Sequence, residues 1–299
     1  MADSQKAAFR EALASAKNII VLSGAGLSVA SGISTFRGST ASTDVNLDYH
    51  TPEAFKTVPG AVWFYHQRMR AQCFDAQPND AHKAIAALSI PVVQHRIARA
   101  ASTAPVHVTQ NIDELGLRVL GMLPEAFKSE EQASNVIQMH GSIFSTRCTS
   151  CRHVHYSLTR SPSAKLENIV NENASLIDVP EDSLPRCGGD EWQGSNRYGK
   201  CGGLLRPDVV WFGEIPPLMG EIARRMNWCD LLIVVGTSFT VQPAAGFAKQ
   251  VKDRGGKVAV FNAEPSAGDA LADYLFLGKC EETLPEAMGV TEDIARLWP

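Results

Sequence analysis

The sequence contains no apolar run long enough to cross a bilayer, which takes about 18 residues. Its longest strongly apolar stretch is the short segment Leu231 to Val235, so we expect no membrane partner. The N-terminus also lacks a signal-peptide core and an arginine-rich transit pattern. We therefore expect the protein in the cytoplasm or nucleus. Because a removed targeting peptide would leave no trace, the mitochondrion stays open as a third location.

An excess of positive charge is also missing, because 28 Lys and Arg residues face 32 Asp and Glu residues, for a net charge of −4. Proteins that bind nucleic acid mainly through phosphates carry clustered basic residues, so we expect no direct nucleic-acid partner. The 299 residues are 44% hydrophobic and 20% charged, which is typical of a soluble globular protein. This length allows one large domain and a smaller module, and we expect a monomer.

A disulfide framework is not indicated, because the number of cysteines is odd and no secretion signal is present. The seven cysteines are Cys73, Cys148, Cys151, Cys187, Cys201, Cys229 and Cys280.

Four of these cysteines have the spacing of a metal site. Cys148 and Cys151 are separated by two residues, Cys187 follows after 35 more, and Cys201 after a further 13. Two such pairs can close a tetrahedral zinc site with no position left for water, so we expect a structural Zn2+. The alternatives are reduced thiols without metal, or replacement of one ligand by His153, His155 or Asp190.

Short apolar runs rich in Val and Ile predict buried parallel strands with helical patterns between them. We therefore expect an α/β fold, a doubly wound parallel Rossmann-like sheet with a smaller zinc-binding and helical module. The expected strands are Ile19–Leu22, Val106–Thr109, Leu231–Val235 and Val258–Phe261, and the expected helices are Ala81–Leu88, Pro217–Trp228 and Pro243–Arg254.

The domain boundaries follow from changes in composition. The stretch from Cys148 to Arg206 is rich in Cys, Gly, Pro, Asn and Ser, which predicts a loop-rich inserted module. A second, polar stretch covers Gly38 to His50, and Thr51-Pro52-Glu53 after it is typical of a helix start. We expect a Rossmann-like domain from residues 1–37, 81–142 and 207–299, a helical part from 38–80 and a zinc-binding module from 143–206.

A glycine-rich turn, Ser23 to Ser28, follows the first expected strand. Glycines let a backbone approach a pyrophosphate closely at a helix N-terminus. Val29 stands where the usual dinucleotide fingerprint has its third glycine, so a plain strand-to-helix turn is an equal alternative.

Polar side chains follow two further apolar segments. Gln110, Asn111 and Asp113 come after one expected strand, and His140 follows the apolar segment Val136 to Met139. Ligands of open α/β sheets bind beyond the carboxyl ends of strands. Neutral imidazole can accept a proton near pH 7, which suits His140 to general-base catalysis. The alternatives are a hydrogen-bonded structural histidine and ordinary turn residues.

Three motifs together resemble the signatures of the sirtuins, which are NAD-dependent protein deacylases. They are the run from Gly24 to Gly38, the run from Thr109 to Asp113, and His140-Gly141. The resemblance implies NAD as cofactor, His140 as general base and a zinc held by the four cysteines. It implies that the cofactor is bound by Gly24, Ala25, Gly26, Ser28, Phe36, Arg37, Gln110, Asn111, Asp113, Gly236, Thr237, Ser238, Asn262, Glu264 and Cys280.

Two of these assignments depend on the resemblance. The residues themselves favour a simple turn at Gly236 to Ser238 and a buried structural thiol at Cys280.

The segment Trp63 to Arg70 predicts a helix, which places Tyr65 and Arg68 on one face. A guanidinium and a phenol together suit a carboxylate, although an amphipathic helix with its arginine in water is the alternative. The pair resembles the mark of class III sirtuins, which remove succinyl, malonyl and glutaryl groups from lysine. The resemblance also implies that a strand-like segment pairs with the substrate peptide, through Val210, Phe212, Gly213 and Glu214.

The implied reaction begins when the acyl oxygen of an acyl-lysine protein or peptide attacks the nicotinamide ribose carbon. Nicotinamide leaves, an alkylamidate forms, and His140 helps deprotonate the ribose, so that lysine and O-acyl-ADP-ribose result. The alternatives are an ADP-ribosyltransferase or plain deacetylase on the same fold, and a non-catalytic NAD-binding module that recognises proteins. The chain departs from the family at Gly116, where a histidine is usual, in a longer segment from Gly121 to Ser134, and in an extended hairpin between Cys187 and Cys201.

Overall fold

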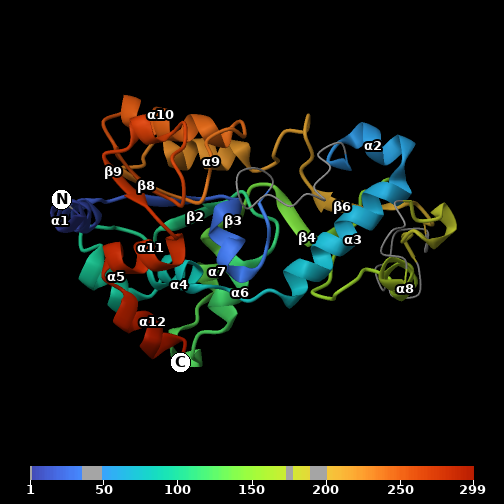
Figure 1. Cartoon of the computed structure of the whole chain (residues 1–299), viewed down its shortest axis with the longest axis horizontal. Helices are drawn as coiled ribbons and strands as arrows, with labels where there is room; N and C mark the ends of the chain where they lie inside the picture. The colour runs from blue at the N-terminus through green and yellow to red at the C-terminus, as the bar shows by residue number, and fades with distance from the viewer. Residues whose placement is uncertain (1, 36–48, 173–177, 189–200) are drawn as a thin grey trace.

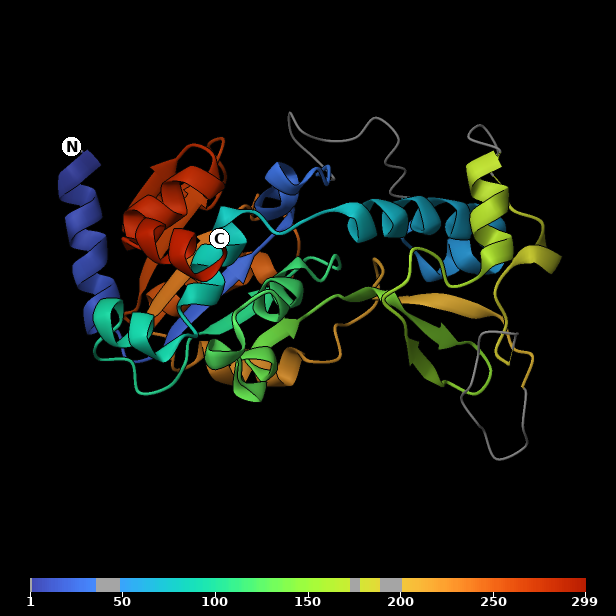
Figure 2. The ribbon, with the colours of Figure 1, turned by 90° about the horizontal axis from the view of Figure 1, so that it is seen from below.

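The computed structural model describes residues 2–35, 49–172, 178–188 and 201–299. The chain forms two parts along its long axis (Figures 1 and 2). The larger part contains both ends of the chain and most of the helices, and the smaller part contains α2, α3 and α8. Within the described ranges, no helix is long and apolar enough to span a membrane.

The larger part is built on a six-stranded sheet in the order β3-β2-β1-β7-β8-β9, and every neighbouring pair is parallel. This confirms the predicted fold class and all four predicted strands. The direction of winding reverses between β1 and β7, which leaves a crevice at the carboxyl ends of these two strands. The strands are β1 (Ile19–Ser23), β2 (Val106–Thr109), β3 (Val136–Gln138), β7 (Leu231–Val235), β8 (Lys257–Asn262) and β9 (Tyr274–Leu277).

Helices cover both faces of this sheet, because its strands are apolar on both sides. Ile19 and Val21 of β1 belong to one core cluster, whereas Ile20 and Leu22 belong to the other. The first cluster is closed by α1 (Ala2–Ser15), α4 (Asp80–Ala87), α5 (Pro91–Ile97), α6 (Leu115–Gly121), α11 (Cys280–Met288) and α12 (Thr291–Leu297), and the second by α9 (Met219–Met226) and α10 (Phe247–Asp253).

The three predicted helices of the larger part correspond to α4, α9 and α10. A 3-10 turn, η5 (Ala244–Gly246), precedes α10 and occupies the start of the predicted helix there. The longer segment after Gly121 contains η3 (Glu125–Phe127) and α7 (Glu130–Ser134), and Ser129 and Gln132 form a capping box at the start of α7.

The smaller part combines an antiparallel sheet in the order β5-β4-β6 with three helices. The prediction of a loop-rich module overlooked α8. Strands β4 and β6 cross the boundaries predicted at 142–143 and 206–207, so both strands connect the two parts of the chain. The elements are β4 (Gly141–Cys148), β5 (Val154–Tyr156), β6 (Leu205–Val209), α2 (Pro52–Thr57), α3 (Pro59–Asp75), α8 (Ala164–Glu172) and η4 (Glu181–Ser183).

Helix α3 is fixed to both parts. Near its C-terminal end, Arg118 of α6 donates hydrogen bonds to the carbonyl oxygens of Cys73 at 2.7 Å and Ala76 at 2.8 Å. Arg70 of α3 is buried and donates to the carbonyl oxygens of Ile143 and Thr159, each at 2.9 Å. Buried donors satisfied in this way hold the helix in one orientation.

Candidate active site

Two glycine turns meet at the crevice between β1 and β7. The backbone N–H of Gly26, in η1 (Ala25–Ser31), donates to the carbonyl oxygen of Gly236 at 2.8 Å. A Cβ on Gly26 would lie 2.7 Å from the Cα of Gly236, and one on Gly24 would lie 2.7 Å from its carbonyl oxygen. Gly236 itself has φ +62°, which L side chains rarely adopt. We call Gly24, Gly26 and Gly236 the glycine cradle. Their closely packed backbone fits a pyrophosphate, although the helix after β1 is of the 3-10 type.

Asn111, Ser28 and Asp113 form a connected polar cluster beside the cradle. The side-chain amide of Asn111 donates to the carbonyl oxygen of Gly24 at 3.0 Å and to Ser28 Oγ at 3.1 Å. Ser28 Oγ in turn donates to Asp113 Oδ2 at 2.6 Å. Burial raises the pKa of the Asp113 carboxyl, while the hydrogen bonds from Ser28 and a backbone N–H oppose that shift. Both amide hydrogens of Asn111 are thus used within the protein, which leaves Oδ1 to accept from a carboxamide.

The imidazole of His140 is held by a backbone carbonyl. Its Nδ1 lies 2.9 Å from the carbonyl oxygen of Gln110. A carbonyl can only accept, so Nδ1 carries the proton of the neutral ring and Nε2 has the free electron pair. Burial lowers the pKa of His140, and the bond to Gln110 only partly opposes this. The imidazole is therefore neutral at pH 7, as a general base must be.

One cavity of about 1520 Å³ joins these groups. Every predicted cofactor and substrate residue in the described ranges lines it, while Phe36 and Arg37 lie outside those ranges. Some lining residues were not predicted, because isolated apolar and aromatic residues in a loop or helix give no signal of a shared wall. They include Ile33, Tyr49, His50, Met69, Cys73 and Gln242.

Cys280, at the start of α11, and Asn262, at the end of β8, each contact one of the two glycine turns. The thiol of Cys280 lies 3.7 Å from the carbonyl oxygen of Gly26, and burial raises its pKa to about 12. Cys280 is therefore a buried neutral thiol that also lines the cavity. Asn262, at the end of β8, donates to the carbonyl oxygen of Thr237 at 3.0 Å. Gln110 donates to Thr237 Oγ1 at 3.2 Å, so the turn after β7 is held from both sides.

Tyr65 and Arg68 line the same cavity from α3. The ring of Tyr65 lies 4.8 Å from that of His50, and burial, with a smaller contribution from Cys73, raises its pKa to about 12. Arg68 is exposed to the open cavity, with its guanidinium 5.7 Å from the centre of the Phe64 ring. The alternative of an amphipathic helix with its arginine in water stays open, because Arg68 is exposed although much of helix α3 is buried. Its buried residues are Gly60, Ala61, Val62, Trp63, Phe64, His66, Gln67, Arg70 and Cys73.

The segment after β6 is held by a charged pair. Arg206 donates to the two carboxylate oxygens of Glu214 at 2.8 and 3.0 Å, and the backbone N–H of Trp211 donates to the same carboxylate at 2.9 Å. Although burial opposes it, this bonding lowers the pKa of Glu214. The indole of Trp211 donates to His66 Nε2 at 3.3 Å, which links the segment to α3. The Glu214 carboxylate therefore holds the conformation of the segment, because its oxygens already accept hydrogen bonds from Arg206 and Trp211.

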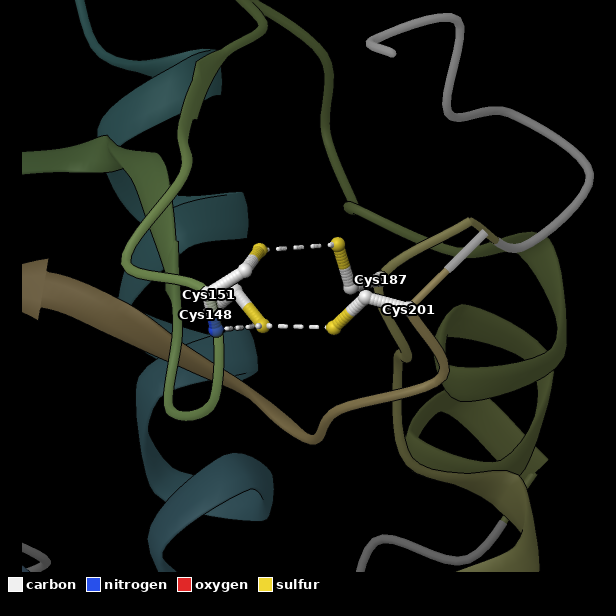
Figure 3. Close-up of side chains that lie close together, drawn as sticks. All are labelled: Cys148, Cys151, Cys187 and Cys201. Carbon is white, nitrogen blue, oxygen red and sulfur yellow. Dashed lines mark hydrogen bonds between the residues drawn. The ribbon is translucent and has the colours of Figure 1, made fainter. Parts of the chain in front are cut away.

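The four predicted cysteine ligands lie together, and their sulfur atoms are all within 4.8 Å of one another (Figure 3). The sulfur of Cys148 is 3.5 Å from that of Cys201, and the sulfur of Cys151 is 3.7 Å from that of Cys187. Tetrahedral zinc with Zn–S bonds of about 2.3 Å places its sulfurs about 3.8 Å apart, so the cluster fits Zn2+.

The structure tests two of the three alternative zinc ligands. His153 and His155 are not part of the one cluster of metal-ligating side chains found among the described residues. Asp190 lies outside those residues. The hydrogen bond from the backbone N–H of His153 lowers the pKa of Cys151 to about 7, which favours the thiolate that a metal binds.

Known proteins similar to this chain share nearly its whole length. A profile described as Sir2 family matches residues 24–243. The chain is 39% identical over 296 residues to "NAD-dependent protein deacylase sirtuin-5, mitochondrial" of Canis lupus familiaris, which covers 97% of this chain and 86% of that protein. It is 39% identical over 290 residues to "NAD-dependent protein deacylase" of Daphnia pulex, covering 94% and 95%. The solved structure of a Sir2 homolog–NAD complex has a TM-score of 0.71 at 30% identity and covers 96% of this chain and 94% of that one.

Proposed function

The chain belongs to the Sir2 family and is an NAD-dependent protein deacylase, and we propose that it prefers lysine acyl groups that end in a carboxylate. These are the succinyl, malonyl and glutaryl groups. The observation that carries the proposal is the position of Tyr65 and Arg68. Both line the cavity that also contains His140 and the glycine cradle.

The two side chains offer complementary chemistry to a carboxylate. The Arg68 guanidinium supplies a permanent positive charge and a planar set of donors. Tyr65 keeps its hydroxyl proton, since its pKa is about 12, and can donate one further hydrogen bond. An acetyl group has no carboxylate to occupy these donors, so preference for an acidic acyl group would follow from orientation of the substrate.

In the proposed reaction, bound NAD supplies the ribose carbon that takes the acyl oxygen as nicotinamide departs. Asn111 would bind the nicotinamide amide through Oδ1, with Asp113 and Ser28 fixing its orientation. Nε2 of His140 would accept the proton of a ribose hydroxyl, because Nδ1 is already committed to the carbonyl oxygen of Gln110. The backbone of Val210 to Glu214 would bind the substrate peptide along the cavity rim.

The test is nicotinamide release, measured with a panel of peptides that carry acetyl-, malonyl-, succinyl- or glutaryl-lysine. The proposal expects faster release with the three acidic groups. Mass spectrometry of the NAD-derived product distinguishes O-acyl-ADP-ribose from ADP-ribosylated protein. NAD binding without any nicotinamide release, unchanged in His140→Ala, would favour the non-catalytic alternative.

We also propose a location and an assembly. The relatives named as mitochondrial support the mitochondrion for this chain, while cytoplasm and nucleus stay the alternative predictions. A monomer without nucleic-acid contacts remains our prediction from charge and composition. Fractionation of cells that express the tagged full-length protein, and its mass in solution by light scattering, test these two points.

A further inference from the structure

A buried histidine, His107, lies against a glycine of α6. His107 is on β2, and Gly116 is in the first turn of α6, three residues after Asp113. A Cβ built on Gly116 would lie 3.0 Å from Cε1 and 3.2 Å from Nδ1 of the His107 ring. These distances are shorter than ordinary van der Waals contact, so the imidazole from β2 occupies space that a side chain from α6 would otherwise enter.

The imidazole begins a chain of buried hydrogen bonds that leads to the cofactor site. Nε2 of His107 is 2.8 Å from Ser23 Oγ, and Ser23 Oγ donates to Thr109 Oγ1 at 2.9 Å. Thr109 Oγ1 also accepts from the backbone N–H of Asn111 at 3.0 Å. Ser23, His107 and Thr109 are 0%, 6% and 6% exposed, so water does not compete for these contacts.

The available protons determine which nitrogen of His107 acts as donor. Ser23 has one hydroxyl hydrogen and gives it to Thr109, so Ser23 Oγ can only accept from the imidazole. Burial lowers the pKa of His107 to about 4, so the ring is neutral at pH 7 and carries one proton. That proton must be on Nε2, and Nδ1 faces Gly116 without it.

We infer that His107 is a positioning residue for the nicotinamide end of the NAD site, and that its imidazole is accommodated by Gly116. Through Ser23 and Thr109 it holds the backbone of Asn111, whose side-chain amide is held separately by Gly24 and Ser28. The inference rests on the proposed role of Asn111 in binding the nicotinamide amide.

The contact between His107 and Gly116 predicts that the imidazole can be moved from one position to the other. If the position of the imidazole matters, a histidine on α6 should replace the one on β2. His107→Val should weaken NAD binding about fivefold, the usual effect of losing one neutral hydrogen bond. Adding Gly116→His to that variant should restore binding to within about twofold of the parent by the same reasoning. His107→Gln, which keeps a donor at a similar reach, should lose less than His107→Val.

Two readouts test this inference, and neither requires turnover. Calorimetric titration of the apo-form with NAD gives the dissociation constant of each variant, and nitrogen-15 NMR of the histidine rings identifies the protonated nitrogen of His107. Val108→Ala is the matched control, because it opens a buried gap in the same strand on the opposite face of the sheet. It should lower thermal stability with NAD affinity unchanged.

Specific outcomes would overturn the inference. They are a folded His107→Val protein with parental NAD affinity, a double variant no better than His107→Val, or a proton on Nδ1 of His107. A parent protein that binds NAD but releases no nicotinamide would contradict the proposed function while these affinity and NMR results still decide the role of His107.

Discussion

His140 Nδ1 and the carbonyl oxygen of Gln110 lie 2.9 Å apart, and this contact determines which nitrogen of the imidazole is free for chemistry. The side chain of Gln110 also donates to Thr237 Oγ1 at 3.2 Å. One residue at the end of β2 therefore orients the candidate base with its backbone and contacts the turn after β7 with its side chain. A shift of the turn after β7 would therefore change the position of His140, because Gln110 contacts both.

The first prediction concerns the acid side of the pH profile. Burial lowers the pKa of His140 below its ordinary value of 6.5, and protonation of Nε2 abolishes its action as a base. The half-point of the acid-side fall in kcat/KM should therefore lie below pH 6.5. His140→Ala should lower kcat by about 10² to 10⁴-fold. A half-point above pH 6.5 would contradict the assignment.

A second prediction concerns acyl preference. Arg68→Met should reduce kcat/KM for succinyl-lysine peptides by about 10 to 100-fold, because a charged hydrogen bond is lost. The value for acetyl-lysine peptides should change little, since they lack the carboxylate. Tyr65→Phe should have a smaller effect in the same direction.

Arg224→Met, at an exposed position on α9, is the matched control for this comparison and should leave both substrates unaffected. An unaltered ratio of succinyl to acetyl activity in Arg68→Met would exclude the proposed carboxylate contact.

The third prediction compares two glycines. Gly26→Ala should weaken NAD binding by at least about tenfold, because its Cβ would lie 2.7 Å from Gly236 and force the cradle apart. Gly246→Ala is the control, since its Cβ would meet nothing closer than 3.8 Å and its backbone is helical, with φ −81°. This control should bind NAD normally and be as stable as the parent or slightly more stable. Equal NAD affinity in both variants would argue against a close backbone cradle.

The fourth prediction concerns zinc. Elemental analysis should find one zinc per chain, and Cys187→Ser should reduce that content and lower the thermal unfolding temperature, because the four sulfurs form one closed site. A strong chelator should lower the unfolding temperature of the parent in the same way. Cys229→Ser, outside the cluster, should keep its zinc. Full zinc content in Cys187→Ser would show that this thiol is not a ligand.

Parts of the fold were predictable because the local signal was strong. The runs Val106–Thr109 and Leu231–Val235 have the predicted bounds, since both strands are continuous apolar segments buried on both faces. Strand β9 (Tyr274–Leu277) was not predicted. It lies at the edge of the sheet and is only partly buried, so four residues with a mixed environment gave no clear period. Helix α8 was overlooked because its surroundings are rich in loop-forming residues.

The candidate site likewise has parts that the sequence predicted and parts that only the fold shows. Spacing indicated the four cysteines, but their pairing of Cys148 with Cys201 and Cys151 with Cys187 depends on contacts between distant segments. Glu214 was predicted to bind substrate, and only the folded chain places Arg206 against its carboxylate.

The amino-acid sequence by itself determined which chemical groups stand at the ends of β1, β2 and β7, because strand propensity and glycine turns act over a few neighbouring residues. Only the tertiary structure decided what those groups contact. The bond from His140 to Gln110 and the fit of His107 against Gly116 arise when strands and helices far apart in the chain pack together. Hydrogen-bond direction and steric exclusion at such contacts depend on atomic positions that no local pattern specifies.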